Sequence, residues 1–288
     1  MKPSPLVLER PYSLEEALAL LAEHGDDAKV IAGGQSLVPL LNFRLAAPAV
    51  LVDLNRLPAL AAIDVADGSV RVGALCSQRV LERHGAALAA CPLLPLALPY
   101  VGHVATRNRG TVGGSIAHAD AAAELPLLLQ TLGGSVEVTG QSGARLVPSE
   151  EFFVSHLTSC LEPDEIVTEV RFPAAGALWG AGFAEVAPRH GDYAVCAVAC
   201  ALRVENGVVA EARLGAGAVS DRPLRLTAAE CALAGTRCEP AALAAAAEEA
   251  RGGVDPADGM HASAEYRRHL TGVLVGRAAH RAYATAAP

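Results

Sequence analysis

Two short stretches that each contain a double glycine constrain this chain more than any other feature of its sequence. The first is Ala-Gly-Gly-Gln-Ser-Leu at 32–37, and the second is Arg-Asn-Arg-Gly-Thr-Val-Gly-Gly-Ser-Ile-Ala-His-Ala-Asp at 107–120. A double glycine permits positive φ and has no Cβ atoms, so consecutive backbone N–H groups can turn towards an anion such as phosphate. Neither stretch contains a lysine, and the two lie far apart in the sequence. A dinucleotide with a central pyrophosphate suits such a pair.

Each double glycine taken alone is as typical of a tight turn as of a phosphate loop. Taken together, with Ser, Thr or Gln donors beside each and an apolar segment before each, they favour one shared ligand. The sequence lacks the Gly-x-x-x-x-Gly-Lys phosphate loop, the Gly-x-Ser-x-Gly nucleophile elbow and the His-Glu-x-x-His zinc motif. It also lacks the Gly-x-Gly-x-x-Gly fingerprint of a Rossmann dinucleotide site.

Length and charge narrow the classes of protein. The chain has 288 residues, enough for two domains or one large one. A net charge of −8 and a pI near 5.6 argue against nucleic acid or an acidic membrane as a partner. Residues 1–5 contain no apolar run of the kind found in secretory signals. The uncharged run 85–102 is interrupted by Pro92, Pro95 and Pro99, which predicts a buried, broken helix and no membrane-spanning segment.

The cysteines predict a reducing cytoplasm and no metal site. Their number, seven, is odd, and no Cys-x-x-Cys pair occurs. Cys196 and Cys200 lie close together, but in an apolar stretch where a free cysteine is commonly a small buried hydrophobe. The chain therefore carries no recognisable iron–sulfur or zinc site of its own.

The first part of the chain predicts a small parallel β-loop-α-β unit. Ser13 and Glu16 form a capping box at the start of an amphipathic helix that Gly25 ends. A strand at 29–32, a helix at 38–45 and a second strand at 51–54 follow. In such a unit a ligand binds at the carboxyl ends of the strands, where the first double glycine lies.

The remainder alternates between strand and helix patterns. We expect strands at 69–75, 135–139 and 165–172, helical segments within 79–98 and at 122–132, and a linker at 173–182. Beyond it, Asn206-Gly207 joins the apolar runs 194–204 and 208–219, which predicts a hairpin with a type I′ turn. Ala-rich helices are expected at 226–234, 240–251 and 263–284.

Four polar or aromatic residues are candidates for contact with the ligand. His118 is placed to bond a ribityl or phosphate oxygen, whereas His103, His156 and His190 fit ordinary loop positions. Asp120 and Glu124 suit ribose or ribityl hydroxyls, and they fit equally well as carboxylates at a helix N-terminus. Tyr193, in Gly191-Asp-Tyr-Ala, fits either a strand-edge aromatic or a ring that covers a flavin.

The two glycine motifs, the run Leu51-Val-Asp-Leu-Asn-Arg56 and Gly191-Asp-Tyr-Ala194 together resemble the FAD-binding medium subunit of molybdenum hydroxylases, the xanthine dehydrogenase and aerobic carbon monoxide dehydrogenase family. The resemblance covers essentially the whole chain and implies an α+β fold. An FAD-binding domain of the vanillyl-alcohol-oxidase type would span 1–175, with subdomains at about 1–56 and 57–175. A smaller C-terminal domain, at 176–288, would contain a three-stranded antiparallel sheet and helices.

The same resemblance implies a set of cofactor contacts. Tyr193, which would lie over the isoalloxazine, is the candidate catalytic residue. The other implied FAD contacts are Lys29, Val30, Ile31, Ala32, Gly33, Gly34, Gln35, Ser36, Leu37, Val101, Gly110, Thr111, Gly113, Gly114, Ser115, His118, Asp120, Glu124, Ile166 and Val167. Two positions depart from the family pattern. Ala121 stands where proline is usual, and Gln35 stands where the carbon monoxide enzymes tend to have His, which weakens an assignment to carbon monoxide.

The resemblance implies an electron-transfer subunit with two partner chains. A small subunit with a 2Fe–2S cluster would supply electrons to FAD, a large subunit would hold molybdopterin, and an external acceptor would receive the electrons. A dimer of such heterotrimers is expected. A self-contained flavin oxidase with its own organic substrate and a nucleotide-binding module without redox activity are the alternatives.

Overall fold

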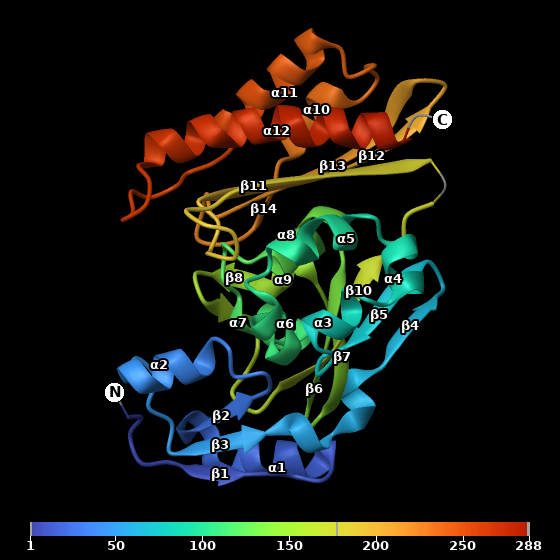
Figure 1. Ribbon diagram of the computed structural model, residues 1–288. Helices are drawn as coiled ribbons and strands as arrows, with labels where there is room; N and C mark the ends of the chain where they lie inside the picture. Colours follow the sequence, from blue (N-terminus) through green and yellow to red (C-terminus); the bar gives the residue numbers. More distant parts are fainter. Residues whose placement is uncertain (1, 177, 287–288) are drawn as a thin grey trace.

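The computed structural model describes residues 2–176 and 178–286, and it stacks three main sheets along the long direction of the molecule (Figure 1). The N-terminal sheet lies at one end and the C-terminal sheet, covered by helices, at the other. A five-stranded sheet and a group of short helices lie between them. The fold is thus a mixture of helix and sheet, as expected.

The first sheet confirms the predicted parallel unit. It contains β1 (Val7–Glu9), β3 (Val50–Asp53) and β2 (Ala28–Ile31) in that order, all parallel. Helix α1 (Leu14–His24) begins where Ser13 Oγ accepts a hydrogen bond from the Glu16 N–H, and it ends at Gly25, which has a φ of +52°. The Glu16 carboxylate accepts from the Tyr12 N–H. Helix α2 (Leu37–Phe43) joins β2 to β3, so the first glycine motif lies at the carboxyl end of β2.

The second sheet is antiparallel and contains two strands that the sequence patterns did not indicate. Its order is β4 (Ile63–Ala66), β5 (Ser69–Gly73), β10 (Ile166–Pro173), β6 (Ser135–Gly140) and β7 (Gly143–Pro148). The missed edge strands β4 and β7 are mostly exposed or half-buried, so they lack an apolar pattern. The small sheet of β8 (Phe153–Ser155) and β9 (Thr158–Ser159) completes this part.

Short helices pack around the second sheet. They are α3 (Gln78–Leu81), α4 (Gly85–Ala90), α5 (Leu93–Ala97), α6 (Val104–Arg109), α7 (Val112–His118), α8 (Glu124–Leu132) and α9 (Ser149–Phe152). The expected helical region 79–98 is broken into three pieces. Pro92 lies at the second break, as predicted, whereas the first break, at 82–84, contains no proline and Pro95 lies inside α5.

The C-terminal sheet corrects two expectations. Its order is β11 (Trp179–Val186), β12 (Cys196–Glu205), β13 (Val208–Gly217) and β14 (Leu224–Arg225), all antiparallel. The expected three-stranded sheet thus has a fourth, two-residue strand. The expected linker at 173–182 is wrong at both ends, because Pro173 closes β10 and β11 begins at Trp179. Gly180 and Gly182, taken as linker residues, instead let β11 approach α12 so closely that a Cβ would meet helix backbone.

The predicted hairpin and terminal helices are confirmed. Asn206 and Gly207 have φ values of +53° and +72°, as a type I′ turn requires. Helices α10 (Thr227–Leu233), α11 (Pro240–Gly252) and α12 (Ala264–Ala286) cover one face of the C-terminal sheet (Figure 1).

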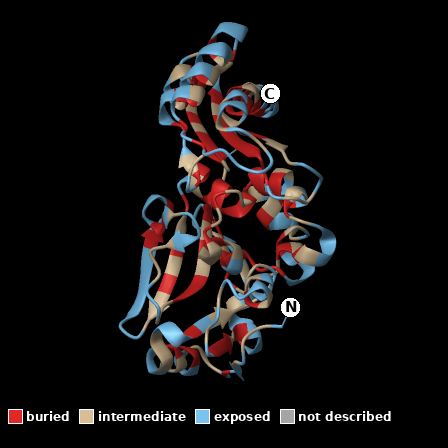
Figure 2. Cartoon of the chain, turned by 90° about the vertical axis from the view of Figure 1, so that its left-hand side faces the viewer, coloured by how far each residue is buried: buried red, intermediate tan, exposed pale blue. Residues whose placement is uncertain are grey.

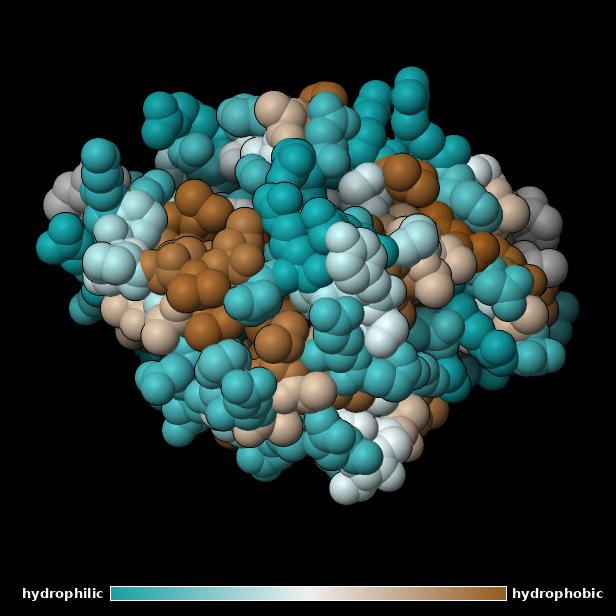
Figure 3. All heavy atoms as spheres, turned by 90° about the horizontal axis from the view of Figure 1, so that it is seen from below, coloured by the Kyte–Doolittle hydropathy of each residue, from teal (hydrophilic) through white to brown (hydrophobic). Residues whose placement is uncertain are grey.

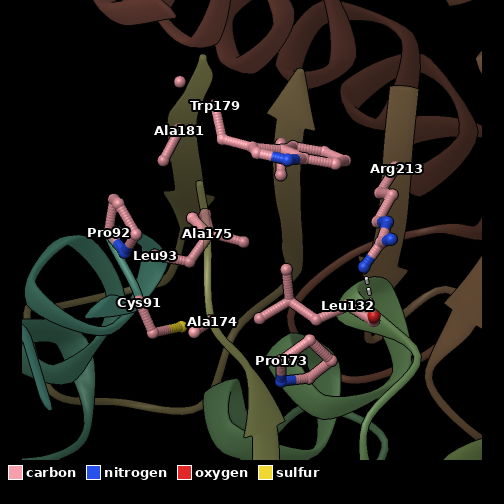
Figure 4. Close-up of a pocket in the computed structure, with 12 residues that line it drawn as sticks. Cys91, Pro92, Leu93, Leu132, Pro173, Ala174, Ala175, Trp179, Ala181 and Arg213 are labelled. Carbon is pink, nitrogen blue, oxygen red and sulfur yellow. Dashed lines mark hydrogen bonds between the residues drawn. The ribbon is translucent and has the colours of Figure 1, made fainter. Parts of the chain in front are cut away.

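Buried residues run through the strands of all the sheets, and they form three hydrophobic cores (Figure 2). A small cavity of about 100 Å³ lies at the seam between the second sheet and the C-terminal sheet (Figure 4). There Arg213 Nη1 donates to the Leu132 carbonyl over 2.8 Å, and its guanidinium stacks over Trp179 at 4.8 Å. The seam is therefore packed by specific contacts.

Apolar side chains gather on the end of the molecule that carries the first sheet (Figure 3). The exposed apolar residues of β1, α2 and the turn after α2 are Val7, Leu8, Val38, Phe43 and Leu45. None of the helices in the described part of the chain has the length and apolar character needed to cross a membrane.

Candidate functional site

The first glycine motif forms an open turn whose N–H groups are free. In the described part of the chain, no acceptor pairs with the backbone N–H groups of Gly33, Gly34, Gln35 and Ser36. Gly34 has a φ of +73°, a conformation that a side chain would strain. Polar backbone groups without protein partners are normally satisfied by solvent or ligand. Four consecutive free donors are the arrangement that binds an anion.

Asn55 holds this turn in place, and sequence reasoning missed it. Its side-chain N–H donates to the Ala32 carbonyl over 2.9 Å and to the Asp53 carboxylate over 2.6 Å. Asp53 in turn accepts from the Asn55 backbone N–H. The Asp-x-Asn spacing after a strand, in the run 51–56, is the signal that could have indicated such a turn.

The second glycine motif differs from the first, which corrects the expectation of two similar loops. Residues 112–118 form helix α7, and Thr111 caps it, because its hydroxyl accepts from the Gly114 N–H over 3.0 Å. Neither Gly113 nor Gly114 has positive φ. The N–H groups of Val112, Gly113 and Ser115 are also bonded, to backbone carbonyls. This motif therefore offers fewer free donors than the first.

The glycines of the second motif serve close packing. The N–H of Gly113 donates to the Ala74 carbonyl over 2.9 Å, and a Cβ on Gly113 would collide with Ala74. A Cβ on Gly33 would collide with the Arg109 carbonyl and come within 2.8 Å of Gly110 Cα. The two motifs thus touch, and the structure brings together the two stretches that the sequence predicts to share a ligand.

Polar candidates gather beside this junction. Asp120 lies close enough to His118, Glu124 and Tyr193 to influence the pKa of each. Burial raises the pKa of Glu124 to about 7, and the Asp120 charge adds to this, whereas its own backbone N–H and Arg107 oppose it. Burial lowers the pKa of His118, against the opposing charge of Asp120. Near neutral pH, Glu124 is therefore an acid that can either donate or accept a proton.

Tyr193 reaches the same place from the C-terminal half. The residue is 60% exposed. Loss of water around the phenol raises its pKa, as do Asp120 and Glu124, whereas the nearby Ser36 hydroxyl lowers it. Ser36 belongs to the first motif, so three segments distant in sequence meet here. The exposed ring leaves a face available for a planar ligand.

Arg107, quoted in the second motif but given no role, joins these segments. Its guanidinium bonds both carboxylate oxygens of Glu82 at 3.1 Å, and Nη1 donates to the carbonyls of Val101 and Gly102 at 2.9 and 3.0 Å. Gly102 lies against Gly191, where a Cβ would come within 3.0 Å of the Gly102 carbonyl. Arg107 therefore supports the turn on which the Gly191–Tyr193 segment rests.

The remaining predicted contacts occupy varied positions. The side chain of Lys29 is exposed on β2, and Val101, Ile166 and Val167 are buried in hydrophobic cores. The other predicted contacts belong to the two glycine motifs or are close to them in the sequence: Val30, Ile31, Leu37, Gly110 and Ser115. Neither the 100 Å³ seam cavity nor a larger groove of about 750 Å³ is lined by any of the predicted site residues. The site is therefore defined by the meeting of its segments and not by these cavities.

Comparison with known proteins agrees with this geometry. Residues 4–175 match the model of the FAD-binding domain in molybdopterin dehydrogenases, and residues 181–282 match that of the carbon monoxide dehydrogenase flavoprotein C-terminal domain. The chain therefore belongs to the family of FAD-binding medium subunits of molybdenum hydroxylases.

Individual relatives match over nearly their whole length. The 6-hydroxypseudooxynicotine dehydrogenase complex subunit alpha of Paenarthrobacter nicotinovorans is 41% identical, over 100% of this chain and 98% of that protein. The structure of carbon monoxide dehydrogenase from Hydrogenophaga pseudoflava superimposes with a TM-score of 0.97 at 35% identity, with both chains fully covered. Quinoline 2-oxidoreductase from Pseudomonas putida 86 gives a TM-score of 0.95 at 37% identity, over 99% of each chain.

The residues present fit the FAD that this family binds. A pyrophosphate needs clustered N–H donors and a close backbone approach. The first motif provides four free donors in succession, and Gly33 leaves no room for a side chain between the two motifs. The acids Asp120 and Glu124 and the ring of Tyr193 lie beside them.

Proposed function

We propose that this chain is the electron-transfer flavoprotein subunit of a molybdenum hydroxylase, which passes electrons from a 2Fe–2S partner chain through FAD to an external acceptor. The observation that carries the proposal is the row of four free backbone N–H groups at the junction of the two glycine motifs. Bound FAD would supply the redox chemistry, since no protein side chain accepts and releases electrons in this way. The chain supplies binding, orientation and electrostatics.

The roles of individual residues follow from their positions. The turn at Gly33–Ser36 would hold the pyrophosphate, and Thr111, Gly113, Gly114 and Ser115 would form its second wall. Asp120, Glu124 and His118 would meet hydroxyls of the ribityl or ribose part, because they lie together beside Tyr193. Tyr193 would cover the isoalloxazine with its exposed ring. The contacts of Val101, Ile166 and Val167 would come from backbone or from the edges of buried side chains.

The finer organisation belongs to the same proposal. An FAD-binding domain at 1–175, of the vanillyl-alcohol-oxidase type with subdomains at about 1–56 and 57–175, is supported by one core under the first sheet and another at the second sheet. The second of these cores also takes in buried residues of β11 and β12. A C-terminal domain at 176–288 has a core of its own. The partners would be a 2Fe–2S small subunit and a molybdopterin-binding large subunit, in a dimer of heterotrimers. Free cysteines throughout the described residues suit a cytoplasmic location.

An anaerobic titration of the purified chain tests the proposal. We expect the chain to retain FAD, because its binding groups lie within one polypeptide. The flavin should be reduced by dithionite but not by aldehydes, purines or other N-heterocycles until the iron–sulfur and molybdenum chains are added. Bleaching of the flavin by an organic substrate in the lone chain would instead establish a self-contained oxidase. Absence of bound flavin would reject both.

Replacement of Arg107 by lysine should loosen the Tyr193 segment. Lysine cannot bond Glu82 through two nitrogens while also bonding two carbonyls, so we expect a loss of about 2 kcal/mol in the free energy of unfolding. The fluorescence of bound flavin should rise, and Tyr193→Ala, which removes the proposed covering ring altogether, should give the upper limit of that rise. Arg213→Lys is the matched control, because Arg213 also holds a backbone carbonyl but lies at the seam away from this site. Equal flavin fluorescence in the two lysine variants would show that Arg107 has no positioning role.

A further inference from the structure

A groove of about 750 Å³ runs along the free edge of the C-terminal sheet, between β11, α12 and the turn at Tyr100. We call it the β11 groove; its lining includes Tyr100, Phe183, Glu185, Leu274, Arg277 and His280. Among the described residues, strand β11 pairs with β12 alone, so no strand pairs with its other edge. Side chains of α12 cover part of that edge: Thr285 Oγ1 accepts from the Ala181 N–H, and Arg281 Nη1 donates to the Phe183 carbonyl. A further strand therefore cannot pair along this stretch.

The β11 groove has an apolar floor and a charged rim. Phe183 and Leu274 are buried, and the half-buried Tyr100 packs on Phe183 with ring centroids 5.3 Å apart. Arg277, His280 and Arg281 are exposed around them. An apolar aromatic centre inside a polar rim, with Tyr and Arg prominent, is the anatomy of a protein–protein interface. A pocket for a small molecule normally encloses most of its ligand. The β11 groove is bordered by exposed side chains and would leave such a ligand largely open to solvent.

The charge of the rim indicates the chemistry of the partner. Two of the four arginines of α12, Arg277 and Arg281, line the groove together with His280, against one acidic residue, Glu185, in a chain whose net charge is −8. Among the described residues, Arg277 forms no ion pair. Local positive charge on an acidic protein selects an acidic partner surface, because opposite charges steer and orient association.

One buried acceptor in the β11 groove also lacks a partner. Glu185 Oε2 is shielded from solvent and has no hydrogen-bond donor among the described residues. Buried polar atoms are normally satisfied, and leaving one unsatisfied costs free energy. An N–H or O–H group of a docked segment would satisfy this oxygen.

The β11 groove borders the proposed flavin site. Tyr100, in the groove, directly precedes Val101 in the chain, and its ring packs edge-on against His190 at 5.9 Å, next to Gly191. The charge of Glu124 also influences Glu185. A chain docked in the groove is thus adjacent to the segment that carries Tyr193.

We propose that the β11 groove is the docking surface for an acidic segment of the iron–sulfur partner chain, an inference that rests on the proposed function. An electron donor must dock close to the flavin, and this groove combines that position with an apolar floor and an unpaired cationic rim. The iron–sulfur chain places acidic side chains against Arg277 and His280, and a donor group against Glu185.

The test uses the complete complex, with all three chains co-expressed. In the double variant Arg277→Glu, His280→Glu we expect the dissociation constant for the iron–sulfur chain to rise at least tenfold, with FAD content unchanged. The matched control is Arg268→Glu, His269→Glu on the same helix but outside the groove, which should stay within twofold of wild type. Wild-type association should also weaken as salt increases.

The outcomes separate this inference from the proposed function. A wild-type chain that binds no iron–sulfur chain would overturn the proposed function itself. Wild-type association that both double variants retain equally would overturn the docking inference alone. Three other results would also overturn the docking inference. The groove variant could lose only the molybdenum chain, or it could break a homodimer of this chain. Native mass spectrometry could also detect a small molecule retained in the groove.

Discussion

Gly33→Ala is expected to abolish FAD retention and to lower the free energy of unfolding by about 3 kcal/mol. The added Cβ would collide with the Arg109 carbonyl, a backbone atom that cannot move without displacing the start of the second glycine motif. The strand end that presents the four free N–H groups would then separate from Thr111 and Gly113. Flavin absorbance of the purified variant and its thermal unfolding measure the two effects.

Gly85→Ala provides the matched control for this steric effect. Gly85 begins α4, and a Cβ there has no neighbour within 4 Å. Alanine in a helix is favoured over glycine by about 1 kcal/mol, so this variant should be as stable as wild type or slightly more stable. It should also retain the wild-type flavin content. If Gly33→Ala retained wild-type flavin content, the junction of the two motifs could not be the pyrophosphate site.

Glu185→Gln is expected to stabilise the chain at alkaline pH and to have little effect at pH 5. Burial raises the pKa of Glu185 to about 8, with help from the charge of Glu124, whose own pKa burial raises to about 7. A folded-state pKa above the unfolded value of about 4.3 means that the folded chain binds more protons in between. Below about pH 4.5, therefore, these two groups do not lower the free energy of unfolding. Their penalty grows as the pH rises, and it is complete at about pH 8.

Because glutamine is neutral, Glu185→Gln removes the part of this pH-dependent loss of stability that is due to Glu185. We expect a gain of about 2 kcal/mol in the free energy of unfolding at pH 8.5, less than the full effect of the pKa shift because solvent screens the half-buried Glu185. Glu151→Gln, which replaces an exposed carboxylate outside the groove, is the matched control. Denaturant unfolding of the chain across pH 5–8.5 measures both. A pH profile that Glu185→Gln leaves unaltered would mean that Glu185 is ionised and solvated in the folded chain.

Local sequence signals predicted those elements whose determinants lie close together in the chain. The capping box at Ser13, the Asn206-Gly207 turn and the apolar periodicity of 263–284 depend on contacts within a few residues, so they are readable without tertiary structure. Edge strands β4 and β7 were missed because half-exposed strands carry little hydrophobic alternation. Gly180 and Gly182 were taken as linker because glycine's packing role beneath α12 is visible only once the helix is in place.

The two glycine motifs, their polar neighbours and the resemblance to the FAD-binding medium subunits of molybdenum hydroxylases are all evident from the order of the residues. The difference between the motifs is evident only in three dimensions, where one is a turn with free donors and the other is a capped helix whose N–H groups are bonded. The roles of Arg107, Asn55 and Glu185 likewise appear only in the folded chain. Burial and hydrogen-bond partners arise from contacts between distant segments, and no local pattern of residues encodes such contacts.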